Sequence, residues 1–153
     1  MTGSREGHAG LLDRVRQALA LVDDRVAAMT TVVAVLKDTF PHYTWVGIYL
    51  LEGDELVLGP YLGKPSPHIR IPVGRGICGA AAAERATIIV DDVHSDPRYL
   101  ACSIETQSEI VVPIMRDDLV LGEIDIDSDV PGAFSRDDQA SLEAVAAILS
   151  EKL

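Results

Sequence analysis

The chain has few cysteines, few basic residues and no long apolar run, and each shortage argues against a class of protein. Only two cysteines, Cys78 and Cys102, occur in 153 residues. Two thiols in a chain of this length do not make the disulfide framework of a small secreted protein, so a reducing compartment, the cytoplasm, is expected. The two sulfurs are also the first candidates for chemistry.

Basic residues are outnumbered, because 13 Lys and Arg face 24 Asp and Glu and the formal net charge is −11. Nucleic-acid binding rests largely on Lys and Arg contacts to phosphate, so this charge argues against a nucleic-acid partner. It argues equally against an anionic membrane surface, and no apolar run approaches the roughly 20 residues that span a bilayer. A single folded domain with neither partner is expected.

The first part of the chain is predicted to be helical after a short leader. Residues 1–8 are polar and are expected to form a flexible leader. Across residues 9–40, apolar side chains recur at spacings of three and four, which is typical of amphipathic helix. Asp23 and Asp24 mark the expected break, because Asp favours helix starts over helix interiors. The segment is long for one domain to bury, so we expect a homodimer through the terminal helices.

Residues 44–134 are predicted to form an antiparallel sheet. Two β-rich runs flank the turn sequence at residues 52–55, which indicates a hairpin. Further strands are expected at residues 69–73, 87–93, 108–115 and 119–127. A capping-box pattern at Ser135 and Asp138 predicts a last helix over residues 135–152. Helices at both ends of a sheet indicate an α+β fold, with the helices packed on one face of a central antiparallel sheet.

The predicted strand at residues 119–127 carries acids and leucines on one face. Alternation places Glu123, Asp125 and Asp127 together, with the isoleucines on the other side. This pattern fits the mouth of a pocket and fits a solvated sheet edge equally well. Glu109 opens an apolar strand, where an acid is usually functional, capping or ion-paired. If these acids converge, repulsion raises at least one pKa, leaving a proton donor near neutral pH and a charge that holds an ammonium group.

A glycine-rich turn at residues 74–79, GRGICG, precedes an alanine-rich helix and contains Cys78. Unpaired N–H groups at a helix N-terminus lower the pKa of a thiol, so we expect Cys78 to be unusually acidic. A buried structural role is the alternative for both cysteines, since free cysteine is among the most buried residue types. The turn lacks the parallel βαβ context of a dinucleotide site, and no histidine or cysteine shows zinc-ligand spacing, so neither cofactor is expected.

Six stretches resemble, in chain order, the GAF-domain free methionine-(R)-sulfoxide reductases. They are WVGIYLLEGDELVLGPYLGK (45–64), IPVGRGICG (71–79), DVH (92–94), LAC (100–102), SEIVVP (108–113) and GEIDIDS (122–128). The resemblance implies a single GAF domain over residues 9–153, with a ligand pocket on the sheet face opposite the terminal helices. It further implies thiol-dependent reduction of free L-methionine-(R)-sulfoxide to methionine. The family uses no cofactor and takes its electrons from an external thiol reductant such as thioredoxin.

The family's roles carry over where its motifs match this sequence. Cys102 in LAC matches the catalytic nucleophile, and Cys78 in GRGICG matches a second family cysteine, here the candidate resolving thiol. Trp45 is similar to the aromatic residue that packs against the substrate methyl group. The acids of the two strand motifs match those that hold the substrate amino group and assist protonation of the sulfoxide oxygen: Glu109, Asp125 and Asp127.

The sequence departs from the family at two places near these motifs. His68 stands where family members usually carry a further cysteine, so Cys78 or an external thiol would have to reduce the oxidised intermediate. Arg98 and Tyr99 replace the family's glycine-histidine pair. These departures leave a second function open, a non-catalytic GAF module that senses or sequesters a small amino-acid-like ligand.

Overall fold

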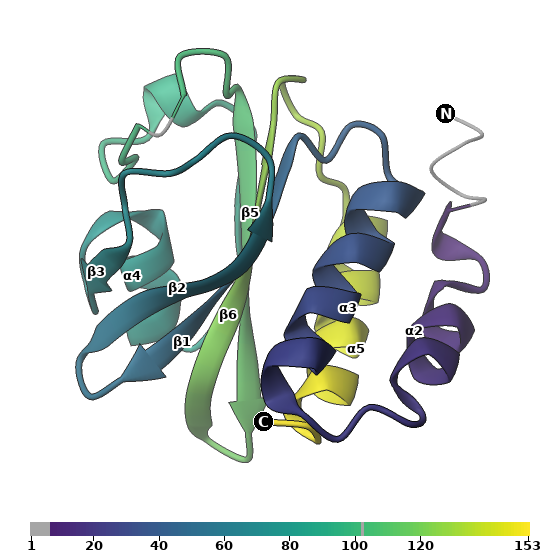
Figure 1. Cartoon of the computed structure of the whole chain (residues 1–153). Coiled ribbons are helices and arrows are strands. Elements are labelled where there is room, and N and C mark those ends of the chain that lie inside the picture. Colours follow the sequence, from purple (N-terminus) through teal and green to yellow (C-terminus); the bar gives the residue numbers. More distant parts are fainter. Residues whose placement is uncertain (1–6, 102) are drawn as a thin grey trace.

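The computed structural model describes residues 7–101 and 103–153, and its centre is a six-stranded antiparallel sheet (Figure 1). The strands are β1 (Trp45–Glu52), β2 (Glu55–Leu62), β3 (Arg70–Pro72), β4 (Ile88–Val90), β5 (Ser108–Arg116) and β6 (Leu119–Ser128). Their order in the sheet is β3-β2-β1-β6-β5-β4. The hairpin predicted between β1 and β2 is confirmed, and β5 and β6 form a second hairpin.

Three helices lie on one side of the sheet, two of them packed on the sheet and the first packed on those two, and one helix covers the other face (Figure 1). The three are α2 (Leu11–Leu19), α3 (Arg25–Thr39) and α5 (Arg136–Ser150), and the single helix is α4 (Gly76–Glu84). This arrangement confirms the predicted α+β class, with the terminal helices sharing one face. Within residues 7–101 and 103–153, no helix is both long and apolar enough to cross a bilayer.

Alternation along the central strand β1 divides its side chains between two cores. Val46 and Ile48 are fully buried in the larger core, beneath the three helices. Trp45 and Tyr49 face the opposite way and join a smaller cluster under α4. Because both faces of the sheet are covered, β1 is apolar on both sides.

Two helix starts follow caps that the sequence carries. The Asp24 side chain accepts a hydrogen bond of 2.8 Å from the backbone N–H of Ala27, so the predicted break before α3 is confirmed. At the start of α5, Ser135 and Asp138 form the reciprocal capping box. The buried Asp138 carboxylate also accepts a hydrogen bond from the Tyr43 hydroxyl, which ties α5 to the chain before β1.

The end of the expected leader is ordered against the last helix. Residues 1–6 lie outside the described residues, but Gly7 and His8 are helical. His8 Nδ1 lies 2.7 Å from Ser141 Oγ of α5, and its ring packs at 4.9 Å from that of Phe40. The leader was expected to extend to residue 8, and these contacts shorten it.

Strand β4 is shorter than the strand predicted over residues 87–93. The Asp92 side chain accepts a hydrogen bond of 3.1 Å from the backbone N–H of His94 and caps a single 3-10 turn, Val93–Ser95. This local cap ends the extended backbone early.

Candidate functional site

Four carboxyl groups converge on the sheet face that α4 covers. Glu109 lies on β5, and Glu123, Asp125 and Asp127 follow at every second position of β6. The register places Glu109 directly opposite Asp127 on the neighbouring strand. All four residues are at most 6% exposed. The interpretation of this face as a solvated sheet edge is therefore wrong, because α4 and the loops around it cover the acids.

Three of these acids share protons. The Glu109 carboxyl forms hydrogen bonds with the carboxyls of Asp125 and Asp127. A hydrogen bond between two carboxyl groups requires a proton between them, so the cluster is not fully ionised. Burial is the largest cause that raises the pKa of Asp125 and of Asp127, and the charge of Asp125 raises the Asp127 pKa further. The pKa values of these acids are raised, as predicted. The prediction rested on repulsion between the carboxylates, whereas burial is the larger cause.

Glu123 is a member of this cluster to which no sequence motif gave a role. Its side chain is fully buried, and neither of its oxygens makes a hydrogen bond of normal geometry with the described residues. Burial is the main cause that raises the Glu123 pKa well above its usual range, followed by the charge of Asp125. Alternation along β6 did place Glu123 on the acid face, and that pattern was the available signal.

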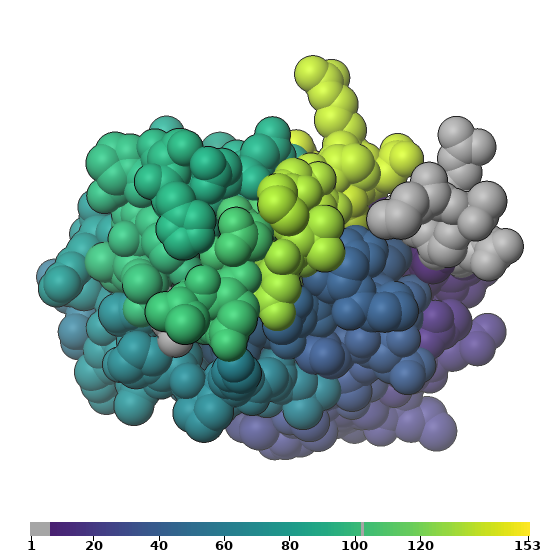
Figure 2. Space-filling model, turned by 90° about the horizontal axis from the view of Figure 1, so that it is seen from above, coloured from purple at the N-terminus to yellow at the C-terminus, as the bar shows by residue number. Residues whose placement is uncertain are grey.

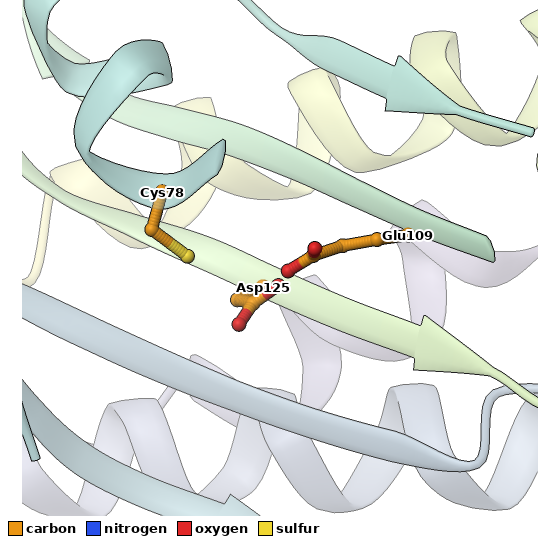
Figure 3. Close-up of side chains that lie close together, drawn as sticks. All are labelled: Cys78, Glu109 and Asp125. Atoms are coloured by element: carbon orange, nitrogen blue, oxygen red, sulfur yellow. The ribbon is translucent and has the colours of Figure 1, made fainter. Parts of the chain in front are cut away.

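Two glycines position the first turn of α4 over the sheet. Gly76 has a φ of +69°, in the left-handed region that glycine adopts without strain. A Cβ at Gly79 would lie 2.6 Å from the backbone oxygen of Pro72, so only glycine permits this approach of α4 to β3. The GRGICG turn thus sets Cys78 against the acids (Figure 3).

Cys78 is buried, at 5% exposure, and its thiol is not acidic. Its pKa is raised well above the ordinary value, first by burial and then by four negative groups, Asp125, Glu123, Glu109 and Asp127. The prediction of a lowered thiol pKa is wrong, because these effects outweigh the N-terminus of α4. A thiol held protonated in this way is a weak nucleophile.

Two cavities lie along the acid face. The larger, of about 320 Å³, has Trp45, Lys64 and Asp127 among its walls. The smaller, of about 20 Å³, lies between α4 and the sheet, with Cys78, Asp125 and other residues around it. Because Asp125 and Asp127 are alternate residues of β6, this strand is the wall that the two cavities share.

The larger cavity presents an aromatic wall, an acid and a cation. The Trp45 indole N–H donates a hydrogen bond of 2.9 Å to the backbone oxygen of Lys64, and its ring stacks on Tyr61. Lys64 Nζ lies 3.1 Å from Glu105 Oε2, which joins the loop after β2 to the loop before β5. Figure 2, seen from above, shows these teal and green segments side by side at the surface. Asp127 and Asp129 line the same cavity, so carboxyl groups outnumber the one lysine there.

His68, which replaces the expected family cysteine, lines the smaller cavity. Its Nε2 lies 3.0 Å from the backbone oxygen of Ala101. Cys102 lies outside the described residues, so its place in the site remains a prediction. Position 68 nevertheless lies against the residue that precedes Cys102 in the chain.

Comparison with known proteins places the chain in a family. The GAF domain family matches residues 11–153. The free methionine-R-sulfoxide reductase of Escherichia coli (strain K12) is 40% identical over 128 residues, which are 84% of this chain and 77% of that protein.

Two solved structures are also similar. The free methionine-R-sulfoxide reductase of Neisseria meningitidis, in complex with its substrate, has a TM-score of 0.91 at 39% identity and covers 95% of this chain and 87% of its own. A putative GAF sensor protein of Burkholderia vietnamiensis has a TM-score of 0.91 at 36% identity and covers 97% of this chain and 94% of its own. The chain therefore belongs to the GAF-domain family, and free methionine-R-sulfoxide reductases are among its homologues.

Proposed function

We propose that the protein is an enzyme that reduces free L-methionine-(R)-sulfoxide to methionine. The observation that carries this proposal is the convergence of Glu109, Asp125 and Asp127 beside two cavities, because Asp127 lines the larger one with Trp45 and the other two acids line the smaller one. The homologous reductases, at about 40% identity over most of the chain, support the same activity.

The larger cavity suits a free amino acid. Its volume of about 320 Å³ is within the range of small-molecule sites. The substrate ammonium would lie against Asp127, and the substrate carboxylate would take the place of Glu105 beside Lys64. The sulfur-bound methyl group would pack on the Trp45 ring, which is 7% exposed and already held by its hydrogen bond.

The reaction would begin at Cys102. Its thiolate attacks the sulfoxide sulfur, the S–O bond breaks, and the oxygen passes to Cys102 as a sulfenic acid while methionine leaves. The proton that Glu109 shares with Asp125 and Asp127 assists the departure of the oxygen. Neutral carboxyl groups at a buried site are well suited to this role, because they can donate a hydrogen bond to the oxygen.

We assign recycling of the sulfenic acid to an external thiol rather than to Cys78. The Cys78 thiol is buried and its pKa is well above the ordinary value, so its thiolate fraction is small. His68 offers no sulfur at the usual family position. An external dithiol would therefore condense with the oxidised Cys102, release water, and restore the thiol in a second exchange. Thioredoxin is the cellular reductant that fits this chemistry.

His68→Cys is expected to restore an internal resolving thiol. Position 68 contacts Ala101, so a sulfur there would lie near the chain at Cys102. One equivalent of the sulfoxide, added without reductant to the H68C/C78S double variant, should produce an intramolecular disulfide. Mass spectrometry of the joined peptides measures it, with C78S alone as the matched control, which should yield a sulfenic acid instead. A double variant that turns over sulfoxide but forms no disulfide would contradict this placement.

A turnover assay tests the activity itself. Purified protein with a dithiol should reduce free L-methionine-(R)-sulfoxide, measured as methionine released. The S epimer should be inert, and the N-acetylated R substrate should be poor because it has no ammonium group to meet the acids. Absence of turnover on the free R substrate would remove the enzyme proposal.

A non-catalytic binding module is the second candidate, because His68 replaces a family cysteine and one of the similar solved structures is a putative GAF sensor protein. Isothermal calorimetry separates the two. Binding of methionine or its sulfoxide without turnover would favour the binding module, whereas both together favour the reductase.

A further inference from the structure

Three buried side chains from three separate elements point at one spot (Figure 3). They are Cys78 of α4, Glu109 of β5 and Asp125 of β6, and one potential ligand atom from each lies within 4.8 Å of the others. Each residue is at most 6% exposed. No spacing rule along the sequence could find this set, because its members are brought together only by the packing of α4 on the sheet.

Asp125 meets Glu109 and the Cys78 thiol, yet one of its carboxyl oxygens accepts no hydrogen bond from the described part of the chain. Its Oδ1 is buried and has no hydrogen-bond partner among the described residues. The neighbouring acids Glu123 and Asp127 also have buried oxygens without partners. Buried polar atoms normally have partners, so these oxygens indicate a ligand that provides positive charge.

Carboxyl groups predominate around the spot, where, within the described residues, His68 is the one other ionisable group that acts on Asp125 besides Glu109 and Cys78. The groups that act on the Cys78 thiol are four carboxyls, and each of them opposes ionisation of the sulfur. A divalent cation at this place would compensate the thiolate and the carboxylates together. That compensation is what allows buried charges to remain ionised.

We propose that Cys78, Glu109 and Asp125 form a binding site for a thiophilic divalent cation, of which Zn²⁺ is the biological example. A thiolate selects zinc or cadmium over magnesium and calcium, which prefer sets of oxygen ligands. Zinc bonds of about 2.3 Å to sulfur and about 2.0 to 2.2 Å to oxygen require only a modest closing of the three side chains.

The smaller cavity contains candidates for a fourth ligand. His68 lines this cavity together with the three proposed ligands, and the space of about 20 Å³ is enough for one water molecule. Either the imidazole or a water can complete a tetrahedral set. The site shares acids with the proposed substrate wall, so a bound cation would exclude the sulfoxide. Cation binding at this site does not require that the protein have reductase activity.

Cadmium binding tests the site without any sulfoxide. Cadmium thiolates give an ultraviolet charge-transfer band that carboxylate and imidazole ligands do not give. Metal-free protein, reduced with a phosphine, should develop this band and saturate it with one equivalent of Cd²⁺. The band should persist in Cys102→Ser and disappear in Cys78→Ser. No band in the parent, or the opposite pattern in the two variants, would overturn the proposal.

The carboxylates are tested by chelator competition. Asp125→Asn and Glu109→Gln should each weaken Cd²⁺ binding by about tenfold or more. The matched control is Asp118→Asn, which removes an exposed acid from the turn before β6 and should leave the affinity unchanged. Circular dichroism identifies which variants fold. If a carboxylate variant does not fold, the comparison of the two cysteine variants still decides the proposal. Equal affinity in all folded variants would overturn the ligand assignment.

Discussion

Cys102→Ser is expected to abolish reduction of free L-methionine-(R)-sulfoxide, lowering kcat on the order of 1,000-fold or more. The physical reason is that the thiolate that attacks the sulfoxide sulfur is gone, and a serine hydroxyl cannot take up the oxygen as a sulfenic acid. Loss of a nucleophile typically has an effect of this size. Steady-state turnover with a dithiol reductant measures it, and calorimetry with methionine shows whether the cavity still binds.

Cys78→Ser is the matched control for that experiment. Its thiol is buried among carboxyls and held protonated, so recycling by an external dithiol should continue and kcat should fall only a few-fold. If instead this variant stops after a single turnover, Cys78 is the resolving thiol and the assignment to an external thiol is wrong. Turnover retained in Cys102→Ser would refute the proposed nucleophile.

Glu123→Gln is expected to stabilise the protein, on the order of 2 kcal/mol at about pH 8, and by much less at about pH 5. Glu123 is fully buried, its oxygens make no hydrogen bond of normal geometry within the described part of the chain, and its pKa in the folded state is well above the ordinary value of 4.5. Glutamine has nearly the same shape but needs no proton to be neutral. The variant therefore removes the cost of holding a proton on a carboxyl that would otherwise ionise.

The sign of the pH dependence follows from the raised pKa of Glu123. At pH values between the unfolded and the folded pKa, the folded state holds a proton that the unfolded state has released. In the unsubstituted protein, the contribution of Glu123 to the free energy of unfolding is fully present below about pH 4.5. It is lost as the pH rises through the pKa of Glu123 in the folded state. The variant should show a shallower fall, with a residual slope from Asp125 and Asp127, whose pKa values are also raised.

Urea unfolding with a chelator present measures this effect at the two pH values. Glu52→Gln, which changes an exposed glutamate at the end of β1, is the control and should show little change at either pH. An equal gain at both pH values would mean that packing, not the proton, causes the effect. No gain at about pH 8 would contradict the assigned protonation of Glu123.

Some parts of the site could be predicted from the sequence because they depend on local geometry. The two-residue period of β6 placed Glu123, Asp125 and Asp127 on one face without knowledge of their neighbours. The caps at Asp24 and Ser135 fixed the starts of α3 and α5, because a cap acts within a single turn. The family resemblance added Trp45 as a candidate and gave the acids and the two cysteines their expected roles.

Other parts could not be predicted, because they depend on contacts between distant segments. The helix N-terminus at Cys78 predicted an acidic thiol, and acids of β5 and β6 reverse that effect. The 3-10 turn after β4 arises from a side-chain cap that competes with extended backbone. The larger cavity is lined by Lys64 and Glu105, an ion pair between two loops whose sequences gave no sign that they meet.

The sequence by itself therefore determined the fold, the central sheet with its terminal helices, and the identity of the candidate acids and thiols. Periodicity, turns and caps act over a few residues, and a single chain displays them directly. Only the tertiary structure decided that the acids are buried rather than solvated and that Cys78 is held protonated. Burial and Coulomb interactions are set by whatever covers a side chain, and here the cover comes from α4 and from loops far along the chain.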